Sequence, residues 1–189
     1  IRYGADAVYL GGQNYGLRAK AQNFTQEEIA AGVEYAHQRD ADLYVTVNIV
    51  PHNDDLIGLP EYIKQLNELD IDGVIVADPG VVSIVQEVAP NLKIHLSTQA
   101  NNTNWRSAFF WQKQGVERII LARELSLTEI KEIKDQVELE LEVFVHGAMC
   151  ISYSGRCLLS NYMINRDSNR GACAHSCRWQ YSLMEQERP

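Results

Sequence analysis

Short apolar runs alternate along the chain with segments of helical periodicity. The runs are rich in Val, Ile, Leu and Tyr, residues that favour a half-buried pleated surface. We predict one β-strand for each run. The six predicted strands are Ala5–Leu10, Leu43–Val50, Gly73–Ala77, Lys93–Ser97, Arg118–Ala122 and Leu139–Val145.

The segments between these runs carry helix signals. Thr25-Gln-Glu-Glu28 and Ser126-Leu-Thr-Glu129 are capping boxes, in which side chains satisfy the free amides of a first helical turn. Each box leads into apolar residues at helical spacing, and Pro60–Leu69 shows the same spacing. Strands that alternate with helices predict right-handed βαβ crossovers and a parallel sheet.

Two α/β architectures fit this alternation, an open doubly wound sheet and a closed (β/α)8 TIM-type barrel. The first loop after a strand lacks the G-x-G-x-x-G order of dinucleotide-binding sheets. Polar residues instead recur where strands end, as in barrel enzymes that build a site on one rim. These residues are Asn48, Asp78, Ser97-Thr98-Gln99, Arg123-Glu124 and His146.

We therefore favour a barrel truncated at both ends. Residues 1–147 would form the partial barrel, and residues 148–189 a cysteine-rich segment of the same domain, after the last strand. The chain opens on Ile-Arg-Tyr and closes on Glu-Arg-Pro, which suggests a piece of a longer protein. Its start does not resemble a signal peptide, and we expect a cytoplasmic location.

The polar rim predicts a binding site for a small anion. We expect Arg123 to hold this anion, because a guanidinium binds a carboxylate with two parallel hydrogen bonds. Gln99, Asn101, Glu124 and His146 should line the same mouth.

The last predicted strand places acidic residues on one face. Alternation puts Glu140, Glu142 and His146 opposite the aliphatic face, so the carboxylates should point into the barrel. Glu142 either pairs with an arginine of a neighbouring strand or acts in catalysis. His146, at the rim, is a candidate catalytic residue.

Charge is distributed unevenly along the 189 residues. The net charge is −8, which argues weakly against general electrostatic binding to nucleic acid or anionic lipid. Residues 150–189, however, hold five Arg against three acidic residues, while residues 1–149 hold 12 Lys and Arg against 22. No apolar run reaches the roughly 18 residues of a membrane span.

All four cysteines lie within residues 150–177. Disulfides are rare in reducing compartments, and a single catalytic thiol would leave three cysteines unexplained. Four thiolates are the number that an iron–sulfur cluster or a structural zinc ion requires. The uneven spacing favours a cluster, and zinc is the alternative. The predicted ligands are Cys150, Cys157, Cys173 and Cys177.

Two adjoining motifs resemble a known signature. Glu142-Val-Phe-Val-His-Gly-Ala-Met-Cys150 and Ser152-Tyr-Ser-Gly-Arg-Cys157-Leu-Leu-Ser160 are similar to the signature of the U32 peptidase, or collagenase-like protease, family. GADAVYLGG, LSTQANNTN, ARELSL and CRW-x-Y also resemble stretches of that family, in the same order. The resemblance implies a (β/α)8 barrel and a [4Fe–4S] cluster on four cysteines. It also implies oxygen-independent hydroxylation of tRNA uridine, rRNA or a quinone precursor.

Within this family, the segment from Ser152 to Tyr181 looks most like the tRNA 5-hydroxyuridine proteins. For RNA-modifying members the resemblance implies prephenate as the hydroxyl donor. Some subgroups take the fourth cluster cysteine from a different position, so Cys150 and Cys157 carry over more securely than Cys173 and Cys177.

Arginines and aromatic residues interleave in the same segment, a combination that binds phosphates and stacks on bases. The arginines are Arg156, Arg166, Arg170 and Arg178, and the aromatic residues are Tyr153, Tyr162, Trp179 and Tyr181. We predict tRNA or another RNA as the partner; the alternative is that these arginines pair with acidic residues of the barrel. The sequence indicates no oligomeric state.

Peptidase activity on collagen-like or unfolded protein is the alternative function. The chain has neither the H-E-x-x-H of zinc peptidases nor the G-x-S-x-G of serine hydrolases. A third possibility, a scaffold without chemistry, predicts an inert rim, which the polar residues at the strand ends argue against.

Overall fold

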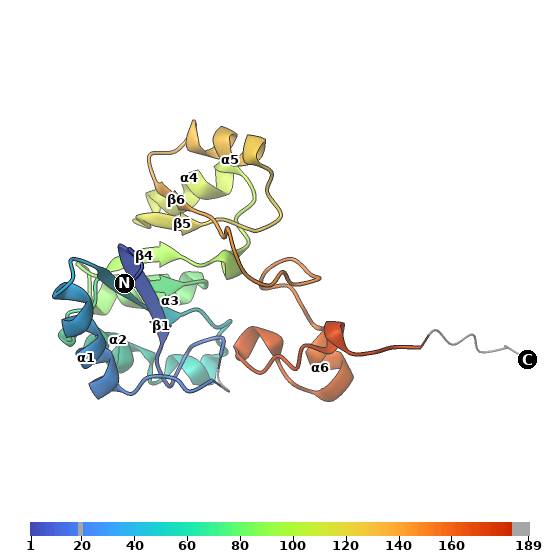
Figure 1. The fold of residues 1–189 in the computed structure, drawn as a ribbon, viewed down its shortest axis with the longest axis horizontal. Helices are drawn as coiled ribbons and strands as arrows, with labels where there is room; N and C mark the ends of the chain where they lie inside the picture. Colours follow the sequence, from blue (N-terminus) through green and yellow to red (C-terminus); the bar gives the residue numbers. More distant parts are fainter. Residues whose placement is uncertain (19–20, 183–189) are drawn as a thin grey trace, which may run out of the picture.

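The computed structural model describes residues 1–18 and 21–182. Six parallel strands form one sheet, and each pairs with its neighbours in sequence. Five helices connect them, and a sixth follows in the cysteine-rich segment (Figure 1). The strands are β1 (Ala7–Gly11), β2 (Asp42–Val47), β3 (Gly73–Val76), β4 (Lys93–Leu96), β5 (Arg118–Ile120) and β6 (Glu140–Glu142). The helices are α1 (Gln26–His37), α2 (Leu59–Glu68), α3 (Pro79–Val88), α4 (Trp105–Lys113), α5 (Leu127–Lys134) and α6 (Leu159–Ile164).

The strand order separates the two architectures considered above. In a doubly wound sheet the order of the strands reverses at the first strand, and helices cover both faces. Here the order runs from β1 to β6 without reversal. The apolar residues of α1 to α5 pack with one face of the strands in a single core, represented by Ile29, Ile63, Val85, Ala108 and Ile133. This is the arrangement of part of a (β/α)8 barrel. In the described chain, β1 and β6 pair with one strand each, so the sheet is curled but not closed.

The opposite, inner face of the sheet has a smaller core. Tyr44, Ile75 and Ile120 are buried there, and Ala7 packs against them. The His95 ring lies 4.3 Å from the Tyr44 ring and is 3% exposed. Side chains of five neighbouring strands, β1 to β5, therefore fill part of the inner face of the curled sheet, as they do in closed barrels.

Both predicted capping boxes are confirmed. The Thr25 hydroxyl accepts a hydrogen bond from the Glu28 amide, and the Glu28 carboxylate accepts one from the Thr25 amide. Ser126 and Glu129 do the same at the start of α5. Among the helices of the described chain, none is long and apolar enough to cross a membrane.

The predicted strand Leu139–Val145 is too long, and the aliphatic face assigned to it is wrong at its end. Leu139 is buried, but Val145 is 93% exposed. Pairing ends at Ile120–Glu142, because β5 stops there and β6 has no second neighbour within the described residues. Beyond Glu142 the chain leaves the sheet and enters the cysteine-rich segment.

Candidate active site at the carboxyl ends of the strands

The loops that follow β4 and β5 are joined by hydrogen bonds. Ser97 is buried and caps a short 3-10 turn, Thr98–Ala100. The Thr98 hydroxyl donates to the Leu121 carbonyl at 3.1 Å, and the Ala122 amide donates to the Asn102 carbonyl at 3.1 Å. The carboxyl ends of the two strands therefore form one rigid rim, which carries Gln99, Asn101, Arg123 and Glu124.

Arg123 binds the cysteine-rich segment at two points. Its Nη2 donates to the Ser154 hydroxyl at 2.6 Å, and its Nη1 donates to the Ala148 carbonyl at 3.4 Å. Ser154 is 2% exposed. The two acceptors lie on either side of Cys150 in the sequence, so Arg123 fixes the loop that carries this thiol. The predicted role of Arg123 as an anion clamp remains a prediction, but two of its five N–H groups are directed to the protein.

Gly155 allows this loop to approach the rim closely. Its φ is +71°, and a Cβ at this position would lie 2.2 Å from the backbone oxygen of Gln99. Any other residue would clash with backbone that cannot move aside. Gly155 was not predicted as a site residue, and only its place inside the motif Ser-Tyr-Ser-Gly-Arg-Cys could have indicated it.

A pocket of about 540 Å³ opens between the rim and this loop. Three segments form its walls: the chain after β4, the β5–α5 connection with the first turn of α5, and the turn between Cys150 and Cys157. The lining residues are Asn101, Thr103, Glu124, Leu125, Glu129, Ser152, Tyr153 and Arg156. The structure thus brings Asn101 and Glu124, predicted for a small substrate, next to Arg156, predicted for RNA. Gln99 lies beside Gly155 and is not part of this lining.

The far end of the cysteine-rich segment is attached near the end of β2. Arg170 forms an ion pair with Asp55, and the Val50 amide donates to the Asn169 carbonyl at 2.9 Å. The hydrogen bond from the His52 backbone amide, and then the guanidinium of Arg170, hold the pKa of the Asp55 carboxyl below its usual value. Arg170 therefore pairs with an acid of the barrel, which was the alternative to RNA binding.

Further hydrogen bonds lie within the cysteine-rich segment itself. The Ser168 hydroxyl and the Asn169 amide group both donate to the Cys157 carbonyl, at 2.6 and 3.2 Å. Arg178 donates to the Met149 carbonyl at 3.4 Å. Polar side chains thus hold the backbone just before Cys150 and the carbonyl of Cys157 itself. Arg166 is half-buried, and Arg156 is exposed at the pocket.

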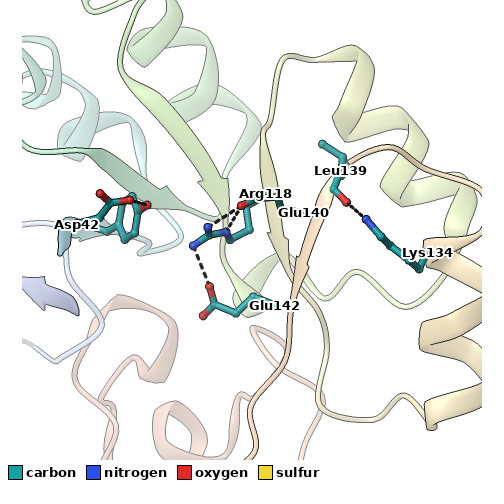
Figure 2. A network of polar contacts seen from close by, with 7 residues as sticks. Asp42, Arg118, Lys134, Leu139, Glu140 and Glu142 are labelled. Atoms are coloured by element: carbon teal, nitrogen blue, oxygen red, sulfur yellow. Dashed lines mark hydrogen bonds and ion pairs between the residues drawn. The ribbon is translucent and has the colours of Figure 1, made fainter. Parts of the chain in front are cut away.

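Glu142 belongs to an ion-pair network on the inner face of the sheet, not to the rim (Figure 2). Arg118 of β5 donates to the Glu140 carboxylate at 2.6 and 2.8 Å, and its Nη1 lies 3.6 Å from the Glu142 carboxylate. The interpretation of Glu142 as the partner of a neighbouring arginine is confirmed. Its catalytic role remains a prediction without support from these contacts.

The surroundings on the inner face also lower the pKa values of two neighbouring groups, His95 and Glu140. Burial, and then the nearby charge of Arg118, lower the pKa of His95 to about 4. The hydrogen bond from Arg118 lowers the pKa of the Glu140 carboxyl. His146, the other predicted catalytic residue, is exposed, and its side chain forms no hydrogen bond with another described residue. The structure does not bring Glu142 and His146 into one pair.

Comparison with known proteins identifies the family. The model of peptidase family U32 matches residues 1–189. The chain belongs to peptidase family U32. It is 54% identical to tRNA hydroxylation protein P1 of Bacillus subtilis over 185 residues, which are 98% of this chain and 44% of that protein. It is 48% identical to tRNA hydroxylation protein P of Escherichia coli over 184 residues, 97% of this chain and 41% of that protein.

Two further comparisons place this U32 chain more broadly. It is 37% identical to the 23S rRNA 5-hydroxycytidine C2501 synthase of Escherichia coli, over 99% of this chain and 28% of that protein. The solved structure of the U32 peptidase Mk0906 superposes with a TM-score of 0.61 at 22% identity, covering 73% of this chain and 60% of the other, which supports the fold alone. The chain spans less than half the length of these curated relatives.

The four thiols of the U32 chain suit a metal centre in kind and number. All are free, and Cys157 is half-buried whereas Cys150, Cys173 and Cys177 are exposed. In the part of the chain that the structure describes, no three Cys, His, Asp or Glu side chains lie close enough together to hold a metal ion. Four thiols are the number that either a cluster or a structural zinc ion requires, and binding would require them to converge. The cysteine-rich segment predicted for residues 148–189 includes residues 183–189, which lie outside the described chain.

Proposed function

We propose that this chain is the part of an RNA hydroxylase that carries the modification site, with uridine in tRNA as the substrate. The observation that carries the proposal is the identity of 48–54%, over nearly the whole chain, with proteins named for tRNA hydroxylation. The site geometry is consistent with it, since the rim, the pocket and the loop between two thiols adjoin one another.

The proposal includes a [4Fe–4S] cluster held by Cys150, Cys157, Cys173 and Cys177. Thiolates are the usual ligands of such clusters, and a bound cluster would supply one-electron chemistry. The protein would position the ligands, because polar side chains hold the backbone beside the first two thiols. These side chains are Arg123, Arg178, Ser168 and Asn169. Zinc is the alternative occupant.

The hydroxyl donor and the location follow from the family resemblance and the proposed substrate. We propose prephenate as the donor of the hydroxyl group, as the resemblance implies. Because the substrate is RNA and the cysteines are free thiols, we propose a cytoplasmic location.

Two alternatives remain as second candidates. The description of the family names peptidases, so cleavage of collagen-like or unfolded protein is one. The relative named as an rRNA 5-hydroxycytidine synthase makes rRNA the other RNA substrate, and hydroxylation of a quinone precursor rests on the resemblance alone.

Mass spectrometry of nucleosides tests the substrate. Deleting the gene should remove a hydroxylated uridine from digested tRNA and leave rRNA nucleosides unchanged. A normal tRNA profile with a missing hydroxylated rRNA nucleoside would transfer the proposal to rRNA. Normal profiles of both RNAs, together with cleavage of a denatured collagen-like peptide by the purified protein, would favour the peptidase.

Iron and sulfide analysis tests the centre. The protein made from its complete gene and purified without oxygen should contain iron and sulfide, with broad absorbance near about 400 nm. Cys157→Ala should abolish both. A colourless protein with stoichiometric zinc would contradict the cluster.

A further inference from the structure

The pocket at the rim is walled on one side by the turn between two thiols. Ser152, Tyr153 and Arg156 belong to this turn, and Cys150 and Cys157 stand at its two ends. Arg123 and Gly155 hold the turn against the rim. A ligand in this pocket would therefore lie beside the loop that presents the first two predicted cluster ligands.

The pocket wall combines an aromatic ring with a cation. The Tyr153 side chain is 55% exposed although its neighbour Ser154 is buried, so the ring is available to a ligand. Arg156 lies three residues further on the same wall. A tyrosine face stacks on an unpaired base, and an arginine binds the adjoining phosphate. A volume of about 540 Å³ is within the range of small-ligand sites.

The charges of the pocket argue against a dicarboxylic acid as its ligand. Glu124 and Glu129 contribute two carboxylates, and Arg156 contributes one guanidinium. The Glu129 carboxylate is occupied, since it accepts hydrogen bonds from the amide and hydroxyl of Ser126. The Glu124 carboxylate accepts no hydrogen bond from another described residue, so it is available to an N–H donor of a ligand. A neutral ring with an N–H on its edge fits these charges better than a dianion does.

We propose that this pocket receives a single pyrimidine base of the RNA, turned out of its stack. The base stacks on Tyr153, its N–H donates to the Glu124 carboxylate, and Arg156 binds a flanking phosphate. The inference rests on the proposed RNA function and adds to it the place and orientation of the reacting base. It also assigns the small anionic substrate to a position outside this pocket.

Photochemical crosslinking tests the location of the base directly. The probe is an RNA stem–loop with one 4-thiouridine in its loop, added to the protein made from its complete gene. The adduct should map to the tryptic peptide from Asp135 to Arg156, at Tyr153. An adduct confined to other peptides would overturn the proposal. This result is read from the wild-type protein and does not depend on the folding of any variant.

Binding of the same stem–loop tests the role of the ring. Tyr153→Leu should weaken binding by about 5- to 150-fold, the range expected for loss of one stacked base, and Tyr153→Phe should restore it. Tyr3→Leu is the matched control, because Tyr3 is fully exposed and lies outside the pocket and the predicted RNA-binding segment. Equal affinities for wild type, Tyr153→Leu and Tyr3→Leu would overturn the proposal.

Glu124→Leu removes the hydrogen-bond acceptor and so separates recognition of the base edge from general RNA affinity. It should reduce the preference for the uridine loop over one carrying 3-methyluridine, which lacks the N–H, to nearly none. An unchanged preference would contradict the contact with Glu124. Failure of the proposed function is distinguishable, since it would appear as normal tRNA and rRNA nucleosides in the deletion strain, whatever the crosslink shows.

Discussion

Arg123 lies at the rim as predicted, but its observed hydrogen bonds are to the protein itself. The sequence placed it at the end of a strand and predicted an anion clamp. The structure confirms the rim position and directs two of its N–H groups to Ser154 and Ala148. The prediction rested on the ability of a guanidinium to form two parallel hydrogen bonds. In the structure the same group binds two points of one loop. Sequence alone cannot distinguish these partners, because the loop that supplies them is 25 and 31 residues away.

The first prediction at the residue scale concerns this connection. Arg123→Lys keeps the charge but cannot bridge two acceptors in the same way, so residues 148–157 should open more often. Hydrogen–deuterium exchange of amides in this loop should rise in Arg123→Lys and rise further in Arg123→Ala. Arg106→Lys is the control, because Arg106 lies on α4 over the Trp105 ring. Unchanged exchange in Arg123→Ala would refute the positioning role.

Gly155 gives a second prediction at this scale. Gly155→Ala should lower the free energy of unfolding by about 2 kcal/mol or more, because it adds both a strained φ and a clash with the Gln99 carbonyl. Gly4→Ala is the matched control, since Gly4 has a φ of +89° and no atom within 4 Å of the added Cβ. Chemical denaturation of both variants measures the difference. Equal losses would mean that the close approach contributes nothing.

Among the helices and strands, those that begin with a local sequence signal were predicted correctly from that signal. The capping boxes at Thr25 and Ser126 each begin a helix, because the caps act within one turn. The ends of the strands were less predictable. Leu139–Val145 alternates over its whole length, yet only Glu140–Glu142 pairs, because pairing depends on where β5 ends. Helix α6 was not predicted; it has six residues and no side-chain hydrogen bond at its N-cap.

The inner face of the sheet gives a prediction on pH. The pKa of His95 in the folded state is about 4, below its ordinary value of 6.5, so protonation favours the unfolded chain. The stability associated with neutral His95 is fully present above pH 6.5 and is lost as the pH falls through about 4. The loss is of the order of 3 kcal/mol at most.

His95→Phe keeps a ring against Tyr44 and removes the titration. Denaturation between pH 4 and 7 should show a shallower decline of the unfolding free energy in this variant than in wild type. Parallel curves for wild type and His95→Phe would show that His95 does not titrate on unfolding in this range.

At the scale of the whole molecule, the cysteine-rich segment spans two distant parts of the rim. Arg123 attaches it near the end of β5, and the Arg170–Asp55 pair attaches it beyond the end of β2. The order of the strands was predictable from the alternation of runs and helices. These attachments were not, since Asp55 and Arg170 are 115 residues apart and no local pattern links one to the other. The uneven charge of the chain indicated only that the basic residues 150–189 could contact the acidic residues 1–149.

We propose that this segment and the rim together hydroxylate uridine in tRNA. The most direct measurement is the amount of hydroxylated uridine in tRNA from a strain that lacks the gene and carries either the wild-type gene or its Cys157→Ala form. Wild type should restore the nucleoside, and Cys157→Ala, expressed at an equal level, should not. Equal restoration by both genes, or no loss of the nucleoside in the deletion strain, would contradict the proposed hydroxylation.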